Sequence, residues 1–302
     1  MPGVTTADQV GKRETVANII TNIAPSKTPF QQIIGDEGID GINPQWQEDG
    51  LDAAADNAMV QGAPAPTYAF TATVMRQNYT QIFSKVVTVS RTARRVATYG
   101  RRDEFAYQAE KKSKEIKKDR ERALLKGVAA VAVAPTGAAA GKLAAAQAMI
   151  DAACVTAAGT NPLSETLVLT ANQVLYDVGG EADILMIKPR DATIVADFAK
   201  ATGRTRYIDG GAQTVVNAVN IYVSPYGEQR VVMNRFLPAT DALLFEPDNW
   251  KLLTLDAWRM YDIAKTGDAD SKAIVGEFSL KHLNFKASAL ITGLTGVQAN
   301  TV

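Results

Sequence analysis

The segment RRDEFAYQAEKKSKEIKKDRERALLK, residues 101–126, contains neither proline nor glycine, and Gly127 follows it directly. Phe105, Ile116 and Leu124 recur near one face at helical spacing, and two acids near the start complement the helix dipole. At ~1.5 Å per residue the predicted helix is about 40 Å long. A helix of this length is typical of a scaffold element on which shorter elements pack.

The charge of the chain is balanced overall but divided between two segments. The 302 residues include 32 basic and 32 acidic side chains. Residues 76–126 carry fifteen positive and six negative charges, whereas residues 28–75 carry seven acids and no lysine or arginine. The zero net charge excludes a protein that coats DNA by bulk charge, although it leaves a local basic patch open.

The rarity of histidine and cysteine excludes most metal and redox chemistry. Cys154 is the single cysteine and cannot form an internal disulfide, and we expect it to be inert packing. His282 is the single histidine, so a Ser-His-Asp triad would have to use it. We expect a structural histidine there.

Two short motifs resemble known sites and fail on chemistry. The segment 137–142 imitates a phosphate loop, but Leu143 stands where a Walker A motif needs a hydroxyl. Asp268 and Asp270 begin like a calcium loop, yet the glycine and the final glutamate are missing. The sequence therefore predicts no enzyme activity, no cofactor and no metal, and these aspartates are expected in a charged turn between strands. No signal peptide or membrane span is expected, because the longest uncharged stretch is polar.

Upstream of the long helix the pattern predicts an arm and an extension. Two short amphipathic helices are expected at 13–23 and 28–35, packing on something other than each other. Residues 68–76 and 79–90 read as strands around a turn at Gln77 and Asn78, which predicts a long antiparallel hairpin. Neither strand alternates cleanly, so we expect the hairpin to lie on a neighbour.

Downstream of the long helix an alanine-rich link, 128–148, marks a domain boundary, and its second half is predicted to be helical up to Gly159. The mixed order of the later elements predicts an α+β fold rather than a repeating βαβ sheet. They are a helix at 171–178, a strand at 183–188, a helix after Pro189, a hairpin of 220–223 and 229–233, and strands at 243–246, 250–255 and within 274–294.

The local sequence resembles the major capsid proteins of tailed bacteriophages with the Hong Kong 97 fold, and within them a group with short N-terminal arms. The segments that carry the resemblance occur in the family's order over nearly the whole chain. They are SKTPF (26–30), PQWQED (44–49), NYTQI (78–82), YQAEKKSKEIKKDRE (107–121), NRF (234–236), EPDNWKL (246–252) and AKTGD (264–268). One departure is Arg91, where related sequences often have glycine.

The resemblance implies a division of the chain into four parts. These are an N-arm (1–44), an extended E-loop hairpin (45–90), a P-domain (91–140 and return strands 245–302) with its spine helix at 101–127, and an A-domain (141–244). Some members crosslink neighbours through a Lys-Asn isopeptide bond. Lys85 is the only E-loop lysine, and the sequence identifies no asparagine partner, so that chemistry is not expected here.

The implied function is that of a major capsid protein that self-assembles into hexamers and pentamers of an icosahedral or prolate head around double-stranded DNA. The arm helices are predicted to begin by about Arg13, so a separate scaffolding protein is expected. A portal protein, an optional decoration protein and DNA bound without sequence-specific contacts are the other implied partners; no membrane is involved. The chain would be assembled in the host cytoplasm and located in the virion.

Two alternatives stay open at this point. The first is an encapsulin-like compartment that encloses a cargo enzyme. The second is a nucleic-acid-binding protein that uses the basic stretch 91–122, although its aromatic residues occupy packing positions rather than forming a stacking motif.

The opposite charges of the two segments suggest a contact between subunits. The acids at 49, 52 and 56 would face basic residues of another chain. The proposed contact residues are Asp49, Asp52 and Asp56 on one side and Arg94, Arg95, Arg101 and Arg102 on the other.

Overall fold

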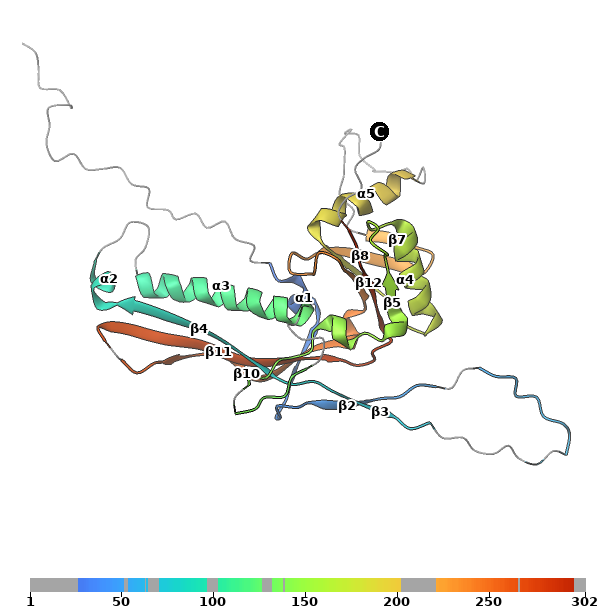
Figure 1. Cartoon of the computed structure of the whole chain (residues 1–302), viewed down its shortest axis with the longest axis horizontal. Helices are drawn as coiled ribbons and strands as arrows, with labels where there is room; N and C mark the ends of the chain where they lie inside the picture. The colour runs from blue at the N-terminus through green and yellow to red at the C-terminus, as the bar shows by residue number, and fades with distance from the viewer. Residues whose placement is uncertain are drawn as a thin grey trace, which may run out of the picture.

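The computed structural model describes residues 27–51, 54–62, 64, 71–96, 103–126, 132–137, 139–201, 221–265 and 267–295. These residues form two sheets, one long helix and a two-stranded ribbon that projects from the body (Figure 1). The combination of helices with largely antiparallel sheets confirms the prediction of an α+β fold. The helix predicted at 13–23 lies outside the described residues.

The long helix α3, Glu104–Leu125, packs along a four-stranded sheet (Figure 1). It begins three residues later than predicted, because the Asp103 side chain accepts a hydrogen bond from the Phe105 N–H and caps the first turn. The sheet has the order β1-β10-β11-β4. Its strands are β1 (Gly35–Gly38), β10 (Trp250–Asp262), β11 (Ala269–His282) and β4 (Gln81–Ser90).

The hairpin predicted around Gln77 and Asn78 is wrong. Strand β3, Val74–Gln77, pairs antiparallel with β2, Gln45–Glu48, whereas β4 pairs with β11. The strand around Trp46, which the sequence analysis did not predict, supplies the missing partner. Asn78 is fully buried between the strands, where its side chain donates to the Leu280 carbonyl at 2.7 Å and accepts from the Ala144 N–H at 2.9 Å.

Strand β4 does alternate, contrary to the sequence interpretation. Phe83, Val87 and Val89 are buried, while Ile82 and Val86 on the opposite face are exposed. The alternation is hidden in the sequence because both faces carry apolar residues. Lys85 shares the helix side and pairs with Asp119 of α3 at 2.8 Å, which raises the pKa of the lysine.

A six-stranded sheet forms the second half of the body. Its order is β5-β12-β9-β6-β8-β7, and the helices α4 (Glu165–Asp177) and α5 (Ala192–Ala201) pack on one face. The opposite face contributes Met186 and Phe245 to the core that also contains α3 residues. The strands are β5 (Val155–Ala157), β12 (Ser288–Thr292), β9 (Ala242–Phe245), β6 (Ile184–Ile187), β8 (Gly227–Met233) and β7 (Ile221–Ser224).

Most elements predicted in this half are confirmed. The strand before Pro189, the helix after it and the β7–β8 hairpin occur where expected. Helix α4 begins six residues earlier than predicted, and Ser164 caps it.

The helix predicted up to Gly159 is wrong. The chain there makes two 3-10 turns, Ala146–Met149 and Ala152–Cys154, followed by β5. The N–H of Ala144 bonds to the side chain of Asn78, and the N–H of Asp151 bonds to the Phe285 carbonyl. Donors already used by distant partners cannot build an α-helix.

A buried carboxylate joins three parts of the chain. Glu121 of α3 is fully buried and accepts hydrogen bonds from the N–H groups of Phe30 and Gln31 at 2.8 and 3.0 Å. These amides open the short helix α1, Pro29–Ile33, whose N-cap residue Thr28 makes no side-chain cap. Asn234, which follows β8, donates to the same carboxylate at 2.7 Å. Burial raises the pKa of Glu121, and the three hydrogen bonds oppose this rise.

His282 is a structural histidine, as the sequence predicted. Its ring is fully buried and stacks on Trp250 with centroids 3.9 Å apart. One ring nitrogen lies 2.8 Å from the Met149 carbonyl oxygen and the other 3.0 Å from Ser288 Oγ. Burial lowers the pKa of His282 to about 4, and the hydrogen bond to Met149 only partly opposes this shift.

The depressed pKa of His282 predicts acid destabilisation. Between pH 6.5 and about 4 the unfolded chain binds a proton that the folded chain does not, so stability is full above pH 6.5 and falls with pH. The loss should reach about 3 kcal/mol at the lower end of this window. Urea unfolding of the unassembled protein across this range should show the effect, and His282→Asn, which does not titrate there, should show a correspondingly shallower dependence. Parallel profiles for the two proteins would contradict the prediction.

Candidate intersubunit surfaces

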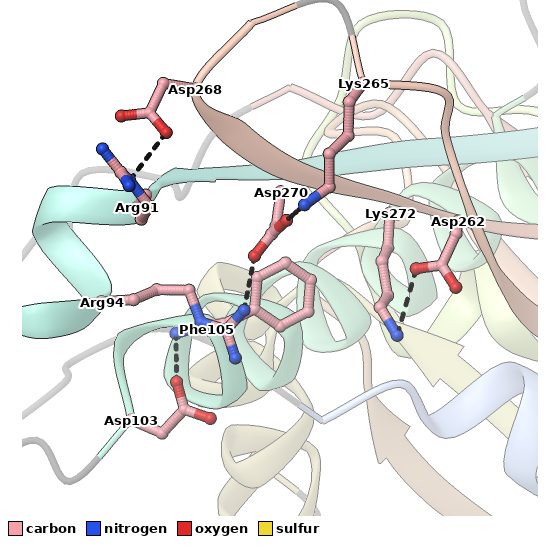
Figure 2. Close-up of polar contacts among 9 residues, drawn as sticks. All are labelled: Arg91, Arg94, Asp103, Phe105, Asp262, Lys265, Asp268, Asp270 and Lys272. Carbon is pink, nitrogen blue, oxygen red and sulfur yellow. Dashed lines mark hydrogen bonds and ion pairs between the residues drawn. The ribbon is translucent and has the colours of Figure 1, made fainter.

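An ion-pair cluster lies where strand β4 leads into the short helix α2, Arg91–Arg95 (Figure 2). Arg91 contacts Asp268 at 2.9 Å, and both Arg94 and Lys265 contact Asp270 at 2.5 Å. Hydrogen bonds from Lys265 and Arg94 lower the pKa of Asp270. Of the two aspartates that begin like a calcium loop, Asp268 lies in the turn between β10 and β11, as predicted, whereas Asp270 is already part of β11; both bind cationic side chains.

Phe105 forms an aromatic wall beside this cluster. The Arg94 guanidinium lies 5.7 Å and the Lys272 ammonium 5.9 Å from its ring centroid (Figure 2). Together with Asp262 and Ile263 these residues line a cavity of about 320 Å³. The positive and negative groups are nearly matched, so the cluster fixes α2 onto the sheet rather than offering an unpaired basic patch.

The proposed contact residues lie on separate parts of one chain. Arg94 and Arg95 belong to α2, at the end of the sheet remote from the ribbon that leads to Asp49 and Asp56 (Figure 1). Asp52, Arg101 and Arg102 lie outside the described residues. A single chain therefore does not bring the described acids and arginines together.

Part of the acidic segment is already used within the chain. Glu37 pairs with Lys281 at 3.0 Å, and Glu48 pairs with Arg76 at 2.6 Å. The Asp36 carboxylate accepts from the Thr254 hydroxyl at 2.8 Å. Asp49 and Asp56 differ: among the described residues, their carboxylates accept only from the nearby N–H groups of residues 50 and 58. These two acids remain available to another molecule.

The ribbon and its loop also expose large apolar side chains. Leu51 is fully exposed, and the exposed fractions of the other apolar side chains lie between 49% and 80%. They are Ile42, Met59, Val60, Val74 and Met75. Sequence reasoning missed this surface, although apolar residues within a segment rich in loop formers were a signal for it. A concentration of exposed apolar groups on a projecting element is typical of a surface that binds protein.

The described residues contain no cluster of three or more metal-ligating side chains. None of their helices has the length and apolar character needed to cross a bilayer. Cys154 is buried, and its pKa is raised by burial, as expected for an unreactive thiol.

Comparison with solved structures defines the class of protein. The structure from Microbacterium phage Oxtober96 is similar over 96% of this chain and 99% of that chain, with a TM-score of 0.67 and 14% identity. The holo-SrpI encapsulin complex from Synechococcus elongatus PCC 7942 is similar over 98% and 97%, with a TM-score of 0.66 and 11% identity. The fold is the Hong Kong 97 fold of phage capsids and encapsulins.

Sequence comparison then separates phage capsids from encapsulins. The family model described as "SU10 major capsid protein" matches residues 3–295. The major capsid protein of Escherichia phage Phieco32 is 32% identical over 96% of each chain. The chain therefore belongs to the SU10 major capsid protein family and is a structural subunit of a phage capsid shell.

The ion pairs in Figure 2 should stabilise helix α2 against local unfolding. Asp270→Asn removes the anion that holds Arg94 and Lys265. The Val96 amide, which bonds to the Thr92 carbonyl at the end of α2, should then exchange roughly threefold faster or more in hydrogen–deuterium exchange. Asp256→Asn, which breaks an ion pair with Arg259 elsewhere on β10, is the control. Equal exchange in both variants would show that the cluster does not hold α2.

Proposed function

We propose that this capsid subunit assembles into hexamers and pentamers that close into an icosahedral or prolate head around double-stranded DNA. The observation that carries the proposal is the match to a phage major capsid protein over 96% of both chains. The exposed apolar ribbon supports it, because exposed apolar groups gathered on one element are typical of a surface that another protein covers.

The proposed division of labour keeps the parts that the resemblance implies but shifts their bounds, because β1 and β4 pair within the sheet that carries α3 and β12 pairs within the six-stranded sheet. The ribbon β2–β3 and its loop act as the E-loop, the sheet with α3 as the P-domain, and the six-stranded sheet with α4 and α5 as the A-domain. The sheet topology supports the division into P-domain and A-domain, since each described strand outside the ribbon belongs to one of the two sheets. The two sheets meet through one core that contains Phe30, Phe245 and Trp250.

The acidic ribbon of one subunit is proposed to lie against basic groups of the next. Asp49 and Asp56 carry unshared charge, and Asp52 adds to it. Arg94 is held by Asp270 in its own chain, so Arg95, Arg101 and Arg102 are the better candidate partners. Single exposed pairs contribute about 0–1 kcal/mol, but the repetition of the contact around a shell directs orientation.

Further partners belong to the same proposal. A separate scaffolding protein, a portal protein and an optional decoration protein would complete a head that assembles in the host cytoplasm. The zero net charge supports packaging of DNA without sequence-specific contacts. The encapsulin alternative is less supported, because the encapsulin similarity is 11% in sequence whereas the phage relative reaches 32%.

Charge reversal tests the assembly proposal. Purified protein should form closed shells, seen by electron microscopy and followed by light scattering. Asp49→Lys combined with Asp56→Lys should impair assembly while leaving the circular dichroism spectrum of the unassembled protein unchanged, because both acids are exposed. Adding Arg95→Glu and Arg101→Glu should partly restore assembly.

The matched control is Asp177→Lys with Glu181→Lys, which makes the same charge change on exposed residues near α4. Assembly of the acid-reversed protein equal to wild type at low and moderate salt would reject the electrostatic contact. Failure of the wild-type protein to form shells under any condition would reject the assembly proposal itself.

A further inference from the structure

Arg120 is a mostly buried cation that makes no salt bridge among the described residues, although the charges of Asp36 and Glu121 act on it and partly offset its burial. Its guanidinium lies 4.3 Å from the Phe278 ring centroid and 5.2 Å from that of Trp258. Burial lowers the pKa of Arg120 to about 10. The ion pairs among the described residues do not include it. A desolvated charge normally requires a partner, because its burial is otherwise unfavourable.

Among the described residues, the Arg120 side chain makes a single hydrogen bond, which leaves its two terminal nitrogens without a partner. The Nε atom donates to Gln31 Oε1 at 2.7 Å, and Gln31 in turn donates from Nε2 to the Lys117 carbonyl at 3.1 Å. Gln31 therefore fixes the guanidinium in place through Nε. Both terminal nitrogens remain available, and these are the atoms that bind a carboxylate in a bidentate pair.

Arg120 lines a cavity of about 360 Å³ between α1, α3 and β10. Apolar walls come from Ile34, Trp258 and Phe278, and the exposed Lys117 adds a second cation. Asp36 is the one acid of the lining, and its carboxylate already accepts from Thr254. The cavity therefore has a net positive charge beside an aromatic wall.

We propose that this cavity binds an acidic side chain from the ribbon loop of a second copy of the chain. The inference rests on the proposed shell assembly and adds a desolvated binding site to the exposed arginines. The occupant is favoured by complementarity: the loop presents Asp49 and Asp56 next to the exposed apolar residues Leu51, Met59 and Val60. A carboxylate beside apolar groups matches a guanidinium beside aromatic rings.

Disulfide trapping between copies tests the location. Lys117→Cys at the rim is combined with Asp49→Cys or Asp56→Cys in one chain, and the native Cys154 stays buried. Oxidised shells should give a ladder of linked chains on a non-reducing gel, and mass spectrometry should identify the joined peptides. Asp177→Cys in place of Lys117→Cys is the control and should give no ladder. Shells that form without a 117-linked ladder would overturn the proposal.

Substitution of the arginine tests the chemistry. Arg120→Gln should raise the protein concentration needed for half-maximal assembly roughly tenfold or more, because the bound carboxylate would lose its charged partner. Arg120→Lys keeps the positive charge but not the planar guanidinium. Its concentration for half-maximal assembly should lie between those of Arg120→Gln and wild type. Arg259→Gln, at an exposed arginine on β10, should assemble like wild type.

The outcomes separate this contact from shell assembly as a whole. Thermal unfolding of the unassembled variants checks that Arg120→Gln is folded; if it is not, the trapping experiment decides. Normal assembly of a folded Arg120→Gln would reject the site. Stabilisation of the unassembled protein by free acetate or phosphate, with no trapped ladder, would show a site for small anions only. If the wild-type protein forms no shells, the proposed shell assembly is rejected, and the site that rests on it is rejected with it.

Discussion

The buried carboxylate of Glu121 constrains where the rest of the molecule can lie. It caps α1, belongs to α3 and accepts from Asn234, so one side chain fixes the arm segment, the long helix and the end of β8 at a single point. All three donors are needed, since a buried carboxylate with fewer hydrogen bonds would be strongly destabilising. Phe30, Glu121 and Asn234 lie within stretches that carry the family resemblance, namely 26–30, 107–121 and 234–236, and Gln31 directly follows the first of them.

The apolar core around this point explains how the two sheets form one body. Phe30 packs edge-on against Phe245 of the six-stranded sheet and Trp250 of the four-stranded sheet, with centroids 5.5 and 5.8 Å apart. Trp250 also stacks on His282. An aromatic side chain from the short helix α1 therefore fills the junction between the sheets, and the Glu121 carboxylate holds α1 there. The hydrogen bonds to Glu121 set the position of α1, while burial of the aromatic side chains supplies most of the stabilisation.

The features that could be predicted from the sequence are those that depend on the pattern of neighbouring residues. The long helix follows from apolar spacing and a run without helix breakers, and the structural role of His282 follows from its apolar strand neighbours. Glu121 could not be identified, because an acid among alternating lysines and glutamates looks like a solvated charge until a distant segment covers it. The β2–β3 pairing was missed for a related reason. Strand partners 26 to 32 residues apart leave no local signal, and the nearer strand 79–90 offered a false one.

The distribution of unsatisfied groups shows which surfaces the folded chain leaves for other molecules. Near α2, Asp268 and Asp270 already pair with Arg91 and Arg94 within the chain (Figure 2). The ribbon is the reverse case: it leaves the body, exposes apolar side chains and keeps Asp49 and Asp56 without cationic partners among the described residues. Arg120 is the opposite case: a mostly buried cation that makes no salt bridge among the described residues, with only the longer-range charges of Asp36 and Glu121 to offset its burial. An exposed acid on the ribbon and a mostly buried cation on α3 can pair when one copy of the chain lies against the next, and contacts of this kind between identical subunits are what closes a shell.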